Sequence, residues 1–189
     1  MDFYKYQKEA MRTAQGMNGN LLANGAMGLA GETAECVEVI ANYLFSSSCN
    51  HLDKEHLSEE IGDILWYLAV IAKEIGYFSE DNIITVSFQE KKKVAEKTGK
   101  MSTVLLNKKV FYLVESVGKC TDLIKKHLFQ GHSLEKDKLT SEIVYIFGLL
   151  AVLSCETGYK LSDIAENNVQ KLKKRYPDGF STEKSINRE

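Results

Sequence analysis

A single proline, Pro177, occurs in this chain of 189 residues. An average content of about 5% would give roughly nine prolines. Proline interrupts helix interiors, and apolar residues recur here at spacings of three and four almost throughout. The sequence therefore predicts an all-α helical bundle with no significant sheet. Its length allows one domain, or two small ones, with a substantial core.

The periodicity and the helix-end signals predict seven helices. Glycines at 16, 19 and 25 predict a loop after the first helix, and Gly76 fits the C-cap of the third. Residues 98–100 are the best candidate linker, and Pro177 and Gly179 close the last helix. Residues 83–86 are β-prone, but the run is short and we assign it to a helix. The expected helices span about residues 3–15, 27–45, 53–76, 82–97, 103–129, 134–157 and 161–175.

Part of the chain repeats itself. Residues 56–77 align without gaps to residues 138–159 with ten identities in 22, and residues 36–45 match 120–129 at four positions. We call 36–77 the first copy and 120–159 the second copy. The repeat predicts two pseudo-symmetric helical hairpins that bury their faces against each other, as two subunits would. We accordingly divide the chain into 1–98 and 99–189, packed as one bundle.

The copies differ mainly in acidic residues. Around the first copy, residues 31–63 hold eight acids and one base, although the whole chain has a net charge of only −2. Under the alignment, three acids meet other residue types in or beside the second copy, and only Glu60 is kept, as Glu142. The replaced pairs are Glu32 with Ser116, Glu35 with Lys119, and Asp63 with Tyr145.

Four acids in and just before the first copy have a spacing that suits a metal ion. Glu32 and Glu35 share one face of a helix, as do Glu60 and Asp63 on the next, and an antiparallel hairpin can bring the pairs together. Four carboxylates repel one another unless a cation lies among them, and all-oxygen ligands favour Mg²⁺, with Mn²⁺ as an alternative. Solvated helix faces with the same spacing are a competing interpretation. A di-iron site is disfavoured because no histidine follows a glutamate by three residues.

The last predicted helix carries groups that complement an anion. Asn168, Lys171 and Arg175 share one face, and a neutral donor with two cations suits phosphate oxygens. A lysine-rich surface helix is the alternative.

Other features exclude some classes of protein. The near-neutral net charge argues against stable nucleic-acid binding. No apolar run reaches about 18 residues, so we expect no membrane-spanning helix. The first residues lack a signal-peptide pattern and the four cysteines lack CxxC spacing, so we expect a cytoplasmic protein.

Three segments together resemble the MazG-type all-α nucleoside triphosphate pyrophosphohydrolases. They are GLAGETAE (28–35), SEEIGDILWYLA (58–69) and NNVQKLKKRYPDGFS (167–181), and they give the pattern ExxE, a spacer, then ExxD. The resemblance covers about residues 1–80 and 159–188. The inserted second copy is a departure from the short members of the family.

The resemblance implies Mg²⁺-dependent hydrolysis of an NTP or dNTP to the monophosphate and pyrophosphate, as in nucleotide-pool house-cleaning. By position, Glu32, Glu35, Glu60 and Asp63 would hold Mg²⁺, and Glu35 is our candidate to accept the proton of the attacking water. The Asn/Lys/Arg face of the last helix would neutralise phosphate charge.

Three questions stay open at the level of sequence. Trp66 and Tyr67 could stack on the base, with simple core packing as the alternative for each. One chain could form an intrachain pseudo-dimer with a single competent site, and further homodimerisation is open. A catalytically silent bundle that binds a nucleotide or a partner protein is the rival function.

Overall fold

The computed structural model describes residues 1–14, 19–48, 51–95 and 101–187, and these parts are all-α, with no strand. The predicted fold class is confirmed. The predicted linker at 98–100 and the end of the fourth helix lie outside the described residues. The helices are α1 (Phe3–Ala14), α2 (Leu21–Phe45), α3 (Lys54–Glu74), α4 (Ile83–Ala95), α5 (Thr103–Gln130), α6 (Lys136–Thr157), α7 (Leu161–Arg175) and α8 (Thr182–Ile186).

The predicted start of the second helix is wrong. α2 begins at Leu21, where the Asn20 side chain caps it by accepting a hydrogen bond from Ala23 N at 2.9 Å, so Gly25 lies inside the helix and not in a loop. A Cβ at Gly25 would lie 2.7 Å from the Ile71 side chain on α3. The glycine therefore serves close helix packing, a use that local sequence patterns do not distinguish from a loop.

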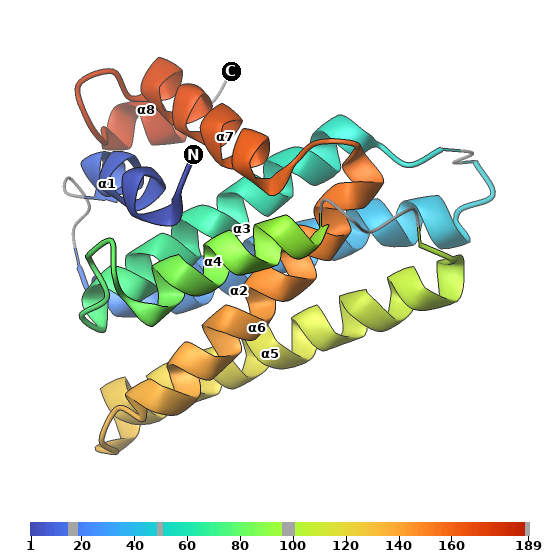
Figure 1. Ribbon diagram of the computed structural model, residues 1–189. Helices are drawn as coiled ribbons and strands as arrows, with labels where there is room; N and C mark the ends of the chain where they lie inside the picture. The colour runs from blue at the N-terminus through green and yellow to red at the C-terminus, as the bar shows by residue number, and fades with distance from the viewer. Residues whose placement is uncertain (15–18, 49–50, 96–100, 188–189) are drawn as a thin grey trace.

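Two helical hairpins form the body of the protein. α2 packs against α3, α5 packs against α6, and the hairpins meet where α2 contacts α5 and α3 contacts α6 (Figure 1). The helix that follows each hairpin packs on the other one: α4 lies on α6, and α7 lies on α3. These contacts are those expected of two equivalent hairpins, while the duplication itself stays a prediction.

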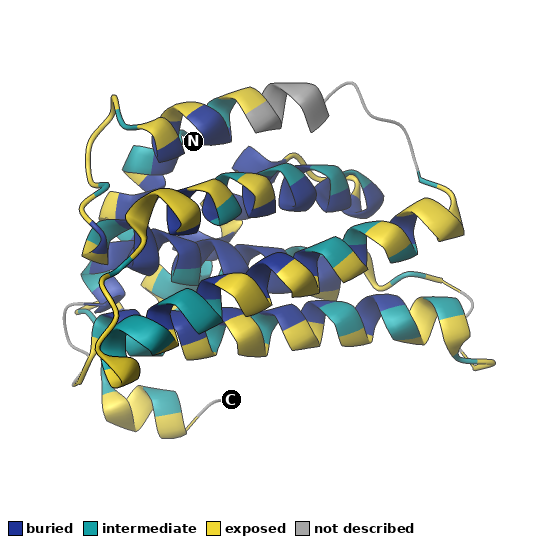
Figure 2. Cartoon of the chain, turned by 90° about the horizontal axis from the view of Figure 1, so that it is seen from below, coloured by how far each residue is buried: buried dark blue, intermediate teal, exposed yellow. Residues whose placement is uncertain are grey.

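The core runs through both hairpins and the first helix. The rings of Phe3 (α1), Phe88 (α4) and Phe147 (α6) contact one another with centroids 4.8 to 5.3 Å apart, and all three side chains are fully buried. Figure 2 shows buried residues along the inner faces of the helices and exposed ones outside. One helix, α6, is long and apolar enough to cross a membrane by length and composition, and 61% of its most apolar window is buried inside the protein. Burial of this kind is typical of a core helix in a bundle.

Candidate active site

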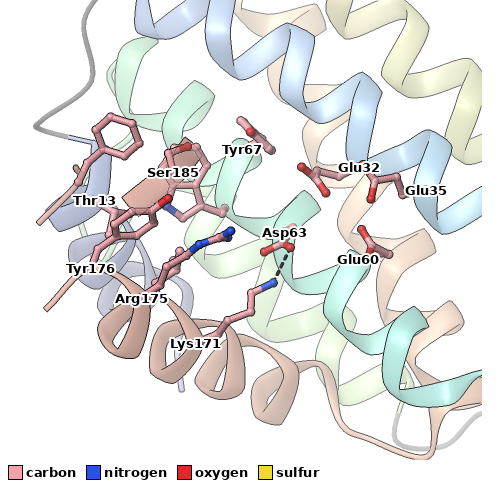
Figure 3. Close-up of a pocket in the computed structure, with 13 residues that line it drawn as sticks. Thr13, Glu32, Glu35, Glu60, Asp63, Tyr67, Lys171, Arg175, Tyr176 and Ser185 are labelled. Carbon is pink, nitrogen blue, oxygen red and sulfur yellow. Dashed lines mark hydrogen bonds and ion pairs between the residues drawn. The ribbon is translucent and has the colours of Figure 1, made fainter. Parts of the chain in front are cut away.

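Three carboxylates converge where α2 packs on α3. Ligand atoms of Glu32, Glu60 and Asp63 lie within 4.8 Å of one another, and Figure 3 shows them facing one pocket. Glu35 is exposed and lines the same pocket outside this tight group. The helix spacing thus brings the two predicted acidic pairs to one place, with three of the four acids in closest contact.

The close approach of these carboxylates disfavours their charged forms. Burial and the neighbouring Asp63 raise the pKa of Glu32 to about 8. The same two causes raise the pKa of Glu60 to about 7, partly opposed by hydrogen bonding to Glu32 and by the charge of Lys171. Two ionised carboxylates cannot share a hydrogen bond, so without a cation the pair retains a proton near neutral pH.

Glu60 has one oxygen with a partner and one without. Its Oε1 lies 3.0 Å from His56 Nε2, one turn earlier on α3. Its Oε2 is buried and, apart from the proton that the Glu32 and Glu60 carboxyls can share, has no hydrogen-bond donor within the described parts of the chain. A buried, unpartnered carboxylate oxygen that faces other carboxylates is a position where a cation would be stabilised.

α7 places donors against Asp63. Lys171 Nζ lies 2.5 Å from Asp63 Oδ2, and Asn168 Nδ2 donates to Asp63 Oδ1 at 2.7 Å. Gly62 leaves room for this approach, because a Cβ there would lie 3.0 Å from Asn168 Cβ and would push the two helices slightly apart. Lys171 and Arg175 line the pocket, whereas Asn168 is buried behind Asp63 and does not line it. A role of Asn168 toward phosphate stays a prediction.

The two aromatic candidates differ in their surroundings. Trp66 is only 5% exposed, and its Nε1 donates to Thr13 Oγ1 at 2.9 Å and to Ala10 O at 3.2 Å, which ties α3 to α1. Tyr67 is half-buried and packs edge-on against Trp66, with ring centroids 4.8 Å apart. Both line the pocket. The contacts of Trp66 are those of a core residue that also forms part of the pocket wall.

Sequence reasoning missed the segment that closes the other end of the pocket. After α7 the chain turns back, and Arg12 Nη1 on α1 donates to the carbonyls of Tyr176 and Pro177 at 3.0 and 2.8 Å. The rings of Tyr176 and Phe180 pack with centroids 5.5 Å apart. The sequence signal for this segment is the YPDGFS part of the third motif, which supports the family resemblance and the end of the last helix but does not indicate that the segment lines the pocket. The pocket residues that we did not predict are Thr13, Leu172, Tyr176, Phe180 and Ser185.

The aligned place in the second copy holds an ion pair in place of an acidic cluster. Lys119 Nζ lies 2.8 Å from Glu115 and 3.7 Å from Glu142, the counterpart of Glu60. The buried cysteines Cys36 and Cys120, aligned with each other, have matching surroundings. Burial and the adjacent glutamate raise the pKa of each thiol to about 12.

The fold and the site define an all-α protein with a carboxylate-lined pocket that faces cationic side chains. Residues 23–97 match the family model of the MazG nucleotide pyrophosphohydrolase domain, which is the family that the motifs of this chain resemble. All four predicted acids lie within the matched residues. No curated protein and no solved structure matches the chain.

Proposed function

We propose that this protein is a Mg²⁺-dependent nucleoside triphosphate pyrophosphohydrolase that acts in house-cleaning of the nucleotide pool. It would hydrolyse an NTP or dNTP with water to the monophosphate and pyrophosphate. The observation that carries the proposal is the carboxylate cluster of Glu32, Glu60 and Asp63, inside a MazG domain and opposite Lys171.

The residues present fit a hard divalent cation. Every donor is a carboxylate oxygen, which suits Mg²⁺ or Mn²⁺, and the buried Glu60 Oε2 has no other partner in the described structure. Glu32, Glu60 and Asp63 would hold the ion, with Glu35 beside them. When bound, Mg²⁺ supplies electrophilic polarisation of the phosphate oxygens and lowers the pKa of water.

The side chains around the pocket would bind the phosphates, accept the proton of the attacking water and contact the base. Lys171 uses one of its three N–H donors on Asp63, which leaves two for phosphate oxygens, and Arg175 offers a guanidinium from the next turn of α7. Both cations favour the negative charge that develops on the phosphates. Glu35 is exposed within the pocket wall, so its carboxylate is accessible to accept a proton from the attacking water. Tyr67 and Trp66 line the pocket and would stack on the base.

The way in which each hairpin packs on the helix that follows the other hairpin supports a single competent site per chain. α7, which follows the second copy, packs on α3 of the first copy and brings Lys171 to Asp63. At the aligned place in the second copy, the Lys119 ammonium already neutralises Glu142. The chain would therefore act as an intrachain pseudo-dimer with one set of acids.

A panel of NTPs and dNTPs with Mg²⁺ or Mn²⁺, assayed for pyrophosphate release, tests the proposed activity. We expect turnover of at least one nucleotide that EDTA abolishes, and loss of turnover in Glu35→Gln. Absence of turnover on the whole panel, with nucleotide binding that is equal in the wild type and in Glu35→Gln, would instead support the silent binding bundle.

Active-site titration tests the single site. We expect about one site per chain, with Glu60→Gln inactive and Glu142→Gln close to wild type. Equal loss of activity in both variants would contradict the one-site arrangement.

A further inference from the structure

Tyr6 lies outside the pocket but is connected to it through two hydrogen bonds. Its side chain is fully buried on α1. Its hydroxyl lies 2.8 Å from Asn168 Oδ1 on α7 and 3.2 Å from the Gly62 carbonyl on α3. Asn168 in turn donates to Asp63 Oδ1 at 2.7 Å. One phenol group thus connects three helices at the point where they surround Asp63.

This chain of bonds fixes the orientation of the Asn168 amide. An ionised carboxylate only accepts hydrogen bonds, so Asp63 requires the amide NH₂ on its side. In that orientation the amide oxygen faces Tyr6 and accepts a hydrogen bond from its hydroxyl at 2.8 Å. Asp63 is then held at both oxygens, by Asn168 at Oδ1 and by Lys171 at Oδ2. Each oxygen has a second lone pair, so the carboxylate remains able to bind a cation.

We infer that Tyr6 is a positioning residue, which acts through Asn168 to orient the Asp63 carboxylate toward the cation. The inference rests on the proposed function only in taking Asp63 as a cation ligand. Groups that hydrogen-bond to a ligand carboxylate typically change metal affinity about 10- to 100-fold when they are removed. Because Tyr6 acts through one intervening residue, we expect an effect at the lower end of this range.

Mn²⁺ binding to the full-length protein, followed by electron paramagnetic resonance without nucleotide, tests the inference. Tyr6→Phe keeps the ring and removes only the hydroxyl, and we expect Mn²⁺ affinity to fall about tenfold. In turnover assays, the Mg²⁺ concentration for half-maximal rate should rise by a similar factor while kcat at saturating Mg²⁺ stays within about threefold of wild type. A merely structural role would lower stability without this separation.

Ser154→Ala is the matched control. Its hydroxyl is also buried and donates one hydrogen bond, to Ala151 O at 2.8 Å in α6, away from the pocket. We expect its Mn²⁺ affinity to be unchanged even where its stability falls as much as that of Tyr6→Phe.

A double-mutant cycle with Asn168→Ser shows whether Tyr6 acts through Asn168. We expect Tyr6→Phe to have no further effect on Mn²⁺ affinity once Asn168 is replaced. Asn168→Ser alone should weaken Mn²⁺ binding at least tenfold. Because Asn168 links Tyr6 to Asp63, this variant tests the same chain of hydrogen bonds if Tyr6→Phe does not fold.

Three results would overturn the inference. The first is a folded Tyr6→Phe variant whose Mn²⁺ affinity stays within twofold of the wild-type value. The others are additive effects of the two substitutions in the double-mutant cycle, or no Mn²⁺ binding by the wild type. The nucleotide panel reports separately on the proposed function, so wild-type turnover combined with an unchanged Tyr6→Phe would reject the inference alone.

Discussion

Replacing Glu60 by glutamine should abolish turnover and at the same time stabilise the metal-free protein. Glu60 is buried beside Glu32 and Asp63, and these surroundings raise its pKa from 4.5 to about 7. A folded-state pKa above the unfolded value means that ionisation opposes folding. The penalty is absent below the unfolded value, grows as the pH rises from about 4.5 to about 7, and is constant above that range.

The size of the effect follows from this shift. At roughly 1.4 kcal/mol per pKa unit, removal of the charge would stabilise the metal-free protein by at most about 3 kcal/mol at pH 8. The hydrogen bond to His56, whose side chain is 52% exposed, offsets up to about 1 kcal/mol. We therefore expect a net gain of about 2 kcal/mol at pH 8 and less than about 1 kcal/mol at pH 5.

Urea unfolding followed by circular dichroism in EDTA, at pH 5 and pH 8, measures this difference. Thermal unfolding at pH 8 should show a Tm rise of about 4–8 °C for a chain of this length. Glu142→Gln is the matched control, because the aligned Glu142 pairs with Lys119 at 3.7 Å and should gain no stability when neutralised. A Glu60→Gln variant that is no more stable than wild type at pH 8, or equally stabilised at both pH values, would refute the reasoning.

Further predictions concern packing, phosphate binding and the cation. Gly28→Ala should destabilise the fold by about 1–3 kcal/mol in urea unfolding, because its Cβ would lie 2.0 Å from the Tyr67 ring. Gly31→Ala, with open space around it, should stabilise α2 by up to about 1 kcal/mol. Lys171→Ala should lower kcat/KM for the nucleotide about 100-fold in steady-state assays. The exposed Lys173→Ala should stay within about twofold. Excess Mg²⁺ should raise the Tm more at pH 8 than at pH 6, because the cation competes with protons for the carboxylates; an equal rise at both pH values would contradict this account.

The candidate site shows what local spacing can predict. Residues three apart share a helix face whatever the helix packs against, so the pairing of Glu32 with Glu35 and of Glu60 with Asp63 could be read from the sequence. That α2 and α3 lie side by side followed from the short connection between them. Only the structure showed which carboxylates lie closest together, namely Glu32, Glu60 and Asp63, with Glu35 exposed at the edge of the cluster.

Gly25 was predicted to lie in a loop but lies inside α2. Gly25 looks like a loop residue by its neighbours, but the side chain of Ile71, 46 positions away, is what requires it. The C-terminal wall of the pocket was missed for a similar reason. Its position depends on Arg12, which donates to Tyr176 O across 164 positions of sequence.

Apart from the start of α2 and the short α8, the sequence by itself determined the helices, and it placed the acids in and just before the first copy, because periodicity and caps act over one or two turns of chain. Only the tertiary structure decided that α7 lies on α3, and that Tyr6 orients Asn168, 162 positions away, toward Asp63. Apolar burial is non-directional, so a pattern of apolar faces does not specify which helices meet. The hydrogen bonds that give the site its geometry form only after those faces have packed.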